Sequence, residues 1–316
     1  MRATLRIATR GSRLALWQAT WVKSKILQNH PDQPVELVIV QTKGDRIQDR
    51  PLSEVGGKGL FVKELEASLL RKEADLAVHS LKDVTGDVPE GLVMPVVTPR
   101  EDCRDALIAP RHGSLSELPS GAVVGTSSLR RAAQILRLRP DLEVQAIRGN
   151  VETRLAKVDS GNADATLLAV AGLKRLGLES RITEIFPPET LLPAIGQGVL
   201  GLEIRESDPD VLGLIQPLQD EITALCCQAE RRLLERLEGN CQVPLAGLCE
   251  RHGQRLFLRG QLLSPDGQQS VEHSATSVVS PDAASALGDE VADAILNSGG
   301  YAILAALNSP TPTSHP

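Results

Sequence analysis

Arginine recurs where a predicted strand gives way to a predicted helix, each time beside a small polar residue that could cap the helix. The arginines are Arg10, Arg130, Arg131, Arg148 and Arg154, and the capping candidates are Ser12, Ser128 and Asn150. A helix N-terminus is partially positive, so an arginine there costs about 0.3–1 kcal/mol unless an anion binds nearby. Carboxyl ends of strands in open α/β sheets face the ligand cleft. We therefore predict an arginine-lined cleft for a ligand with several negative charges.

Two other interpretations of these arginines stay open. Single arginines are mostly solvated surface residues, and a nucleic-acid backbone could also use a basic cleft. Nucleic-acid binding is disfavoured because the net charge is −6 and aromatic residues make up 2% of the chain. Proteins that bind nucleic acids are typically basic and often stack bases on aromatic rings. The 25 arginines against 9 lysines favour two-pronged binding of planar oxyanions.

A Lys-Asp pair follows the predicted buried strand 76–79. Lys82 and Asp83 stand at the carboxyl end of that strand, where a carboxylate could act as a general acid or stabilise a cation. A turn aspartate beside a solvated lysine would give the same pattern. We expect His79 to belong to the strand and not to act as a base.

Cys241 stands in a loop after a predicted helix that ends in arginines. A Gly-Asn pair just before it is typical of a helix end, and a loop thiol could be a nucleophile or a covalent attachment point. A structural role is the alternative. Cys249 with His252 supplies two potential zinc ligands where a structural site needs four, so we expect no metal.

Alternating strands and helices predict an α/β architecture that is used twice. The first block has predicted strands at 5–9, 35–41 and 76–79 and helices at 12–28 and 59–72. The second has predicted strands at 123–125, 144–147 and 165–169 and helices at 128–138, 151–159 and 172–176. The last third predicts a small α+β domain, with helices at 222–237 and 281–296, the latter ended by Gly299-Gly300, and strands at 256–263 and 270–277.

Two segments are longer than ordinary connectors. Residues 42–58 are charged and include a Gly-Gly pair, so we expect a lid or binding loop. Residues 187–201 hold three prolines and three glycines and are interpreted as a hinge or domain crossing. The tail 308–316 is rich in Pro, Ser and Thr, and we expect it to be disordered.

Length and composition limit the number of domains and the cellular compartment that can be expected. The 316 residues favour two or three domains, and no apolar run approaches the roughly 20 residues of a membrane span. The first predicted strand begins at residue 5, so we expect no signal peptide before it. Five cysteines, an odd number, fit a reducing compartment better than a disulfide framework. We expect a cytoplasmic protein that binds neither nucleic acid nor membranes.

Eight segments, all in one order between Leu5 and about Leu307, resemble the porphobilinogen deaminase (hydroxymethylbilane synthase) family. They are RIATR (6–10), VGGKGLFVK (55–63), AVHSLKDV (77–84), VGTSSLRR (124–131), RGN (148–150), LAVAGLKRLGL (168–178), PAIGQG (193–198) and LEGNCQVP (237–244). No single segment is decisive, but the order of all eight is highly specific.

The resemblance implies an α/β fold with two similar type 2 periplasmic-binding-protein-like domains plus a small α+β C-terminal domain. Domain 1 would comprise residues 1–98 with 199–217 and carry the lid loop and the catalytic Asp. Domain 2 would be 103–194, the arginine-rich anion-binding lobe. Domain 3, at 220–307, would carry the cofactor Cys. The family expectation is a monomer.

The implied reaction condenses four porphobilinogen molecules head to tail into hydroxymethylbilane and releases four ammonia. A covalent dipyrromethane cofactor primes it, and by motif match Cys241 is the thioether attachment residue. Asp83, beside Lys82, matches the catalytic carboxylate and can stabilise the cationic azafulvene left when ammonia departs. A cofactor with four added rings would carry about twelve carboxylates, so the cleft would be basic in an acidic protein.

The remaining site residues are carried over by motif. The cofactor-binding positions are Ser80, Lys82, Asp83, Thr126, Ser128, Arg130, Arg131 and Arg148. The substrate-binding positions are Arg10, Ser12, Arg148, Arg154, Arg175, Gln197, Lys58 and Phe61. Departures from the family pattern are Gly11, Thr85 and Asn240, and the last touches the loop that presents Cys241.

Two competing functions are kept. A non-catalytic anion-binding module of binding-protein fold would explain the arginines, but not the loop cysteine or Asp83. A zinc or thiol-redox enzyme would rest on Cys249 with His252, or on Cys226 with Cys227.

Overall fold

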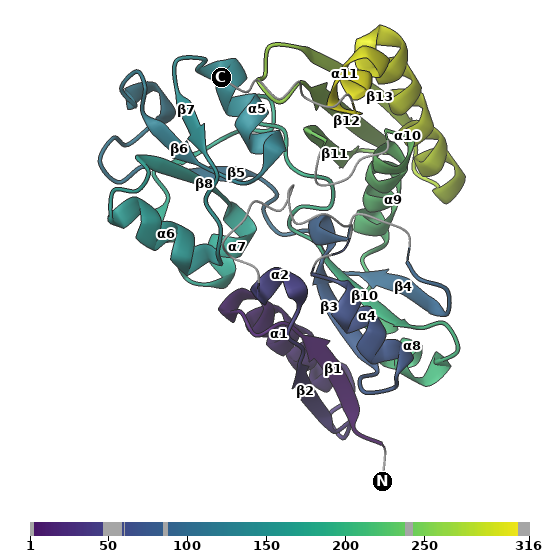
Figure 1. The fold of residues 1–316 in the computed structure, drawn as a ribbon. Coiled ribbons are helices and arrows are strands. Elements are labelled where there is room, and N and C mark those ends of the chain that lie inside the picture. The colour runs from purple at the N-terminus through teal and green to yellow at the C-terminus, as the bar shows by residue number, and fades with distance from the viewer. Residues whose placement is uncertain (1–2, 47–58, 60, 85–87, 238–242, 309–316) are drawn as a thin grey trace.

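Two five-stranded sheets with the same strand arrangement form two α/β lobes (Figure 1). The computed structural model describes residues 3–46, 59, 61–84, 88–237 and 243–308. The first-lobe sheet has the order β2 (Val35–Ile39), β1 (Leu5–Thr9), β3 (Leu76–Ser80), β10 (Leu200–Arg205), β4 (Leu92–Val97). The second-lobe sheet has the order β7 (Glu143–Gln145), β6 (Val123–Gly125), β8 (Ala165–Ala169), β5 (Asp105–Ile108), β9 (Glu184–Ile185).

The two sheets also share strand directions. In each, three neighbouring strands are parallel, the fourth is antiparallel to the third, and the edge strand pairs antiparallel with the fourth. Strand β10 follows the whole second lobe in sequence, yet it pairs with β3, with Leu202 opposite Val78. The chain therefore crosses between the lobes twice, from β4 to β5 and from β9 to β10.

Helices cover both faces of the first-lobe sheet, which explains why its central strands β3 and β10 are almost wholly buried. Successive strand residues point to opposite faces. In β3, Leu76 and Val78 pack with α1 (Arg13–Asn29) and α8 (Pro209–Ile215), while Ala77 packs with α4 (Lys63–Leu70).

The second lobe is built in the same way. Leu167 of β8 joins a core with Ile135 of α5 (Leu129–Leu138). The next residue, Leu168, faces the other side, where it packs with Leu155 of α6 (Val151–Asp159) and Leu173 of α7 (Val170–Arg175). The predicted alternation of strand and helix is thus confirmed in both lobes.

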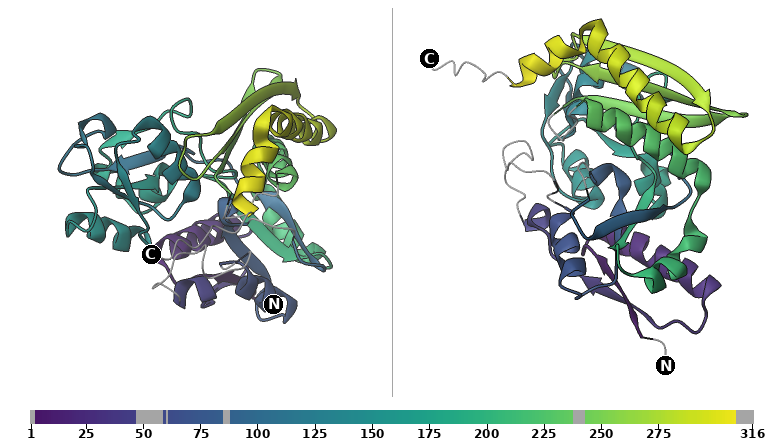
Figure 2. Two further views of the ribbon diagram at one scale, coloured as in Figure 1. Left: turned by 45° about the horizontal axis from the view of Figure 1, so that its top comes forward. Right: turned by 90° about the vertical axis from the view of Figure 1, so that its right-hand side faces the viewer.

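The C-terminal unit is a three-stranded antiparallel sheet packed against helices (Figure 2). The strands are β11 (Leu245–His252), β12 (Arg255–Leu263) and β13 (Ser270–Val278), and the helices are α9 (Glu221–Arg236), α10 (Pro281–Ile295) and α11 (Tyr301–Asn308). Their apolar residues form one core. The α/β fold class with a small α+β C-terminal unit is therefore confirmed. No helix in the described part of the chain is both long and apolar enough to span a membrane.

Several predicted boundaries were wrong. Helix α4 begins at Lys63, not at residue 59, because residues 59, 61 and 62 form turns. The predicted strand 35–41 ends at Ile39, and residues 43–46 of the predicted long loop form a short helix, α2 (Lys43–Arg46).

The C-terminal unit brought two further corrections. Strand β11 was not predicted because its first five residues are all buried and show no alternation. Gly299, at φ +116°, does not end the helical region but allows a kink. The chain then continues into α11, and Leu296 and Ile303 pack on the same core.

Candidate active site

A cavity of about 770 Å³ lies where the two lobes meet the C-terminal unit. The first lobe contributes the ends of β1, β2 and β3, and the second contributes the turns before α5, α6 and α7. Leu234, Val243 and Leu245 line it from the C-terminal unit. Of the predicted site residues, the cavity lining includes Arg10, Ser12, Phe61, Ser80, Lys82, Asp83, Ser128, Arg130, Arg131, Arg148, Arg154, Arg175 and Gln197.

The three predicted helix caps are confirmed. Ser12 accepts a hydrogen bond from the Ala15 N–H at the start of α1, and Ser128 accepts one from Arg131 N–H at the start of α5. Asn150 accepts one from Thr153 N–H at the start of α6. All three helix starts line the cavity, so their partial positive charges point toward one space.

Asp83 lies in a single 3₁₀ turn, η1 (Leu81–Asp83), directly after β3. Leu81 N–H donates to Val199 O at 3.0 Å, and Arg231 from α9 donates to Val84 O at 3.0 Å. The turn is thus held by the crossing segment on one side and by the C-terminal unit on the other. The Asp83 carboxylate accepts no hydrogen bond from any residue that the structure describes, which leaves its oxygens available to a ligand.

Lys82 is a lysine with charged groups of both signs around it. Its Nζ donates to Gln197 Oε1 at 3.2 Å. Burial lowers the pKa of Lys82 to about 8, and the Arg131 charge contributes, while Asp83 and Asp105 act in the opposite direction. A lysine of this kind is charged at neutral pH and loses its charge in mildly alkaline solution.

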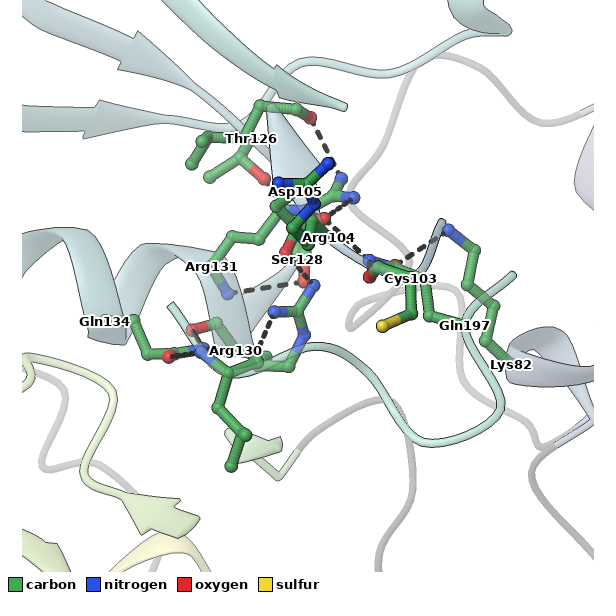
Figure 3. Close-up of polar contacts among 12 residues, drawn as sticks. Lys82, Cys103, Arg104, Asp105, Thr126, Ser128, Arg130, Arg131, Gln134 and Gln197 are labelled. Atoms are coloured by element: carbon green, nitrogen blue, oxygen red, sulfur yellow. Dashed lines mark hydrogen bonds and ion pairs between the residues drawn. The ribbon is translucent and has the colours of Figure 1, made fainter. Parts of the chain in front are cut away.

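Arg130 and Arg131 are not surface residues, because both are about 5% exposed. A fully buried carboxylate, Asp105 at the start of β5, holds them both (Figure 3). Arg130 Nη2 donates to Asp105 Oδ2 at 2.7 Å, and Arg131 Nη2 donates to Oδ1 at 2.7 Å. Gln197 Nε2 also donates to Oδ1, at 2.9 Å.

Sequence reasoning missed Asp105. The signal was present, because a carboxylate directly precedes the short apolar run 106–109 in a chain rich in arginine. A buried aspartate is rare unless it is paired. Burial would raise the pKa of Asp105, but the charges of Arg130 and Arg131 outweigh it and the pKa is lowered. Asp105 is therefore ionised at any pH at which the protein works.

Arg154 and Arg175 carry positive charge that burial leaves poorly solvated. Burial is the main cause that lowers the pKa of each guanidinium to about 10. Arg154 donates through Nε to Gly149 O at 3.0 Å, and Arg175 donates to Gly198 O at 2.7 Å and lies over the Trp17 ring. An anionic ligand would relieve this unfavourable charge.

The remaining predicted residues are also placed. Arg10 stacks on the Phe61 ring at 4.1 Å, and Arg148 is buried at the cavity. Ser80 Oγ accepts from Gln18 Nε2 at 2.9 Å, and Thr126 Oγ1 accepts from Ser128 N–H at 3.1 Å. Each hydroxyl therefore keeps its own proton to donate to an oxyanion. Thr126 is buried beside the cavity and is not part of its lining.

Lys58 and Cys241 lie outside the described residues. The described residues nearest to Cys241 are Leu237, which directly follows α9, and Val243, which lines the cavity. The other four thiols, at Cys103, Cys226, Cys227 and Cys249, are free. No group of three or more potential metal ligands occurs among the residues the structure describes.

Comparisons with known proteins identify the family of the chain. The family model "Porphobilinogen deaminase, dipyromethane cofactor binding domain" matches residues 5–213, and "Porphobilinogen deaminase, C-terminal domain" matches residues 224–297. A porphobilinogen deaminase of Syntrophotalea carbinolica is 50% identical over 311 residues, which is 98% of each chain.

Solved structures resemble the chain more distantly. The methionine-binding protein MetQ is 13% identical, with a TM-score of 0.46 over 75% of this chain and 96% of its own. The periplasmic aliphatic sulphonate-binding protein SsuA of Escherichia coli is 14% identical, with a TM-score of 0.39 over 77% and 73%.

The family models cover both lobes and the C-terminal unit, and they support the enzyme rather than a non-catalytic anion-binding module. Among the described residues, the cavity lining is rich in arginine and hydroxyl groups, and the Asp83 carboxylate in it accepts no hydrogen bond. The chain belongs to the porphobilinogen deaminase family, the transferases that build hydroxymethylbilane on a dipyrromethane cofactor.

Proposed function

We propose that the cavity between the lobes holds both the dipyrromethane cofactor and the incoming porphobilinogen, with Cys241 as the attachment residue and Asp83 as the catalytic carboxylate. The single observation that carries this proposal is the position of Asp83. Its carboxylate accepts no hydrogen bond from the described part of the chain, it lines the cavity, and it interacts electrostatically with Lys82 and Arg154.

The residues present fit the cofactor. Its two pyrrole rings carry four carboxylates, and the cavity offers buried arginines from the second lobe and hydroxyl donors from both lobes. The volume of about 770 Å³ exceeds that of two such rings. Leu234 and Val243, which precede and follow Cys241 in the sequence, line the same cavity, and this supports Cys241 as the attachment residue. When bound, the cofactor supplies the pyrrole carbon to which the first substrate is joined.

The protein's own contributions follow from the geometry. Arg154, Arg148 and Arg10 bind carboxylates and so fix the orientation of the rings. Asp83 accepts the N–H of a pyrrole and stabilises the positive charge that develops on the substrate as ammonia leaves. Lys82 adds a positive charge for the carboxylates next to the reacting centre. Phe61, which lines the cavity, and Lys58 are also proposed to bind the substrate.

An intact-mass measurement tests the attachment. The purified protein is expected to exceed its polypeptide mass by two linked pyrroles, and Cys241→Ser should lack this excess because no other nucleophile is assigned to the cofactor. Cys103→Ser is the matched control, since Cys103 is a half-buried thiol near the cavity, and it should keep the adduct. An adduct that persists in Cys241→Ser would contradict the assignment.

The pKa of Lys82 predicts a pH effect on substrate binding. Because that pKa is lowered to about 8, the ammonium is present below pH 8 and lost above it. The KM for porphobilinogen should therefore rise as pH increases through 8. In Lys82→Met the KM should be higher at pH 7 and this rise should be absent. An unchanged alkaline rise in Lys82→Met would show that another group is responsible.

We also propose the domain boundaries predicted above, with residues 1–98 and 199–217, 103–194, and 220–307 as separate units, and a cytoplasmic monomer without nucleic-acid or membrane partners. The two lobes each have their own sheet and cores, and all described cysteines are free thiols, which supports a reducing compartment. Light scattering should give the monomer mass of 33.9 kDa plus the cofactor.

A further inference from the structure

We propose that Asp105 is a positioning residue for the condensation: its buried carboxylate orients Arg130 and Arg131 and, through Gln197, fixes Lys82 for binding substrate carboxylates. This inference rests on the proposed function of the cavity. It concerns a residue that touches no ligand itself, because Asp105 is fully buried behind the side chains that line the cavity.

Arg130 and Arg131 use only some of their N–H donors on protein atoms. Asp105 accepts from Arg130 Nη2 and from both Nε and Nη2 of Arg131, at 2.7 to 3.2 Å. Leu192 O and Leu167 O accept from the Nη1 atoms. A guanidinium has five N–H donors, so two or three donors of each arginine remain. Both arginines also line the cavity, so the remaining donors are left for a ligand there.

Hydrogen bonds orient the side-chain amide of Gln197. Its Nε2 donates to Asp105 Oδ1 at 2.9 Å and to Cys103 O at 2.7 Å. Because both acceptors lie on the nitrogen side, Oε1 must face Lys82, and it accepts from Nζ at 3.2 Å. Figure 3 shows this chain from Asp105 through Gln197 to Lys82. It links the second lobe to the turn that carries Asp83.

The buried cluster around Asp105 carries more positive than negative charge. One buried carboxylate stands among the cations Arg130, Arg131 and Lys82, so the cluster keeps an excess of positive charge. The charged groups that act on Lys82 are Arg130 and Arg131, which oppose its ammonium, and Asp83 and Asp105, which favour it. Without Asp105 the arginines would repel each other, and the excess charge would no longer be held in a fixed geometry for a ligand to neutralise.

Two variants test the inference. Asp105→Asn keeps the shape but removes the charge and presents an amide that competes with Gln197. Gln197→Met keeps the charges and removes the Gln197 amide, which breaks its hydrogen bonds to Asp105, to Cys103 O and to Lys82. Asp141→Asn is the control, because Asp141 is an exposed aspartate of the same lobe, paired with Arg139 at 2.6 Å. Binding is read from the rise of the thermal midpoint when porphobilinogen is added to each variant in a Cys241→Ser background, which needs no cofactor.

In Asp105→Asn we expect binding of porphobilinogen to weaken at least tenfold and the cofactor adduct in the Cys241 protein to be reduced. In Gln197→Met we expect the alkaline rise of KM to move to lower pH by half a unit or more, because Lys82 loses an acceptor for its ammonium. Asp141→Asn should match the parent in every assay.

The inference would be overturned if Asp105→Asn bound porphobilinogen as tightly as the parent. It would also be overturned if the alkaline rise of KM occurred at the same pH in Gln197→Met as in the parent. If Asp105→Asn does not fold, Gln197→Met decides alone. The proposed function fails by a different result: the parent protein itself would carry no pyrrole mass and would not respond to porphobilinogen.

Discussion

Asp83→Asn is expected to lower kcat for porphobilinogen consumption by at least about 100-fold without unfolding the protein, since stabilisation of developing charge by one group contributes roughly 10²–10³ in rate. Asparagine keeps the size and one acceptor oxygen but removes the negative charge. The wild-type carboxylate has no hydrogen-bonded protein partner among the described residues, so the substitution breaks no internal pair. Steady-state kinetics and a denaturation midpoint measure the two effects.

The position of this carboxylate should matter as much as its charge. Asp83→Glu keeps the charge and moves it by one methylene, and a misplacement of about 1 Å can cost 10²-fold. The control is Asp164→Asn, because Asp164 lies outside the cavity lining and pairs with Arg111. If Asp83→Asn kept more than a tenth of the wild-type kcat, Asp83 would not be the catalytic carboxylate.

The local features of this site could be read from the sequence. Ser12, Ser128 and Asn150 were predicted as helix caps because capping depends on residues three positions apart. The Lys82-Asp83 turn was predicted because a buried apolar run ends just before it. The repeated architecture was predicted because strand and helix periods are themselves local. In each case the interaction that decides the structure lies within a few residues of the motif.

The partners of the arginines could not be read in the same way. Asp105 meets Arg130, Arg131 and Gln197 across 25, 26 and 92 positions of sequence. Such pairings depend on how β5 sits beside β8 and on where the chain crosses back to β10. The sequence pattern therefore predicted an arginine-lined cleft correctly, but it did not reveal that two of the arginines are held from behind by a carboxylate.

A buried carboxylate with partners distant in sequence also lies at the interface between the lobes and the C-terminal unit. Glu230 of α9 is fully buried and pairs with Arg100, which lies between β4 and β5, at 2.7 Å. It also accepts the N–H groups of Gly196 and Cys249. One carboxylate thus joins both crossing segments to the C-terminal unit. Burial raises the pKa of Glu230, and the Arg100 charge is the main influence that opposes it.

Arg100→Met should therefore destabilise the protein by about 3–5 kcal/mol, the usual cost of leaving one member of a buried ion pair unpaired. Urea denaturation at pH 7 measures the change in unfolding free energy. This loss of stability should shrink as pH is lowered. The pKa of an unpaired Glu230 is raised further, so acid protonates its carboxyl group and removes the uncompensated charge. This pH dependence separates an unpaired charge from lost packing.

A double variant and a surface control make that test specific. Arg100→Met with Glu230→Gln removes both charges and should recover a large part of the lost stability, because no uncompensated buried charge remains. Arg71→Met is matched in distance, since Arg71 and Glu73 also lie 2.7 Å apart, but both side chains are more than half exposed. Solvent screens that pair, so its loss should change stability far less. Equal losses in Arg100→Met and Arg71→Met would mean that burial of the Glu230 pair does not hold the three units together.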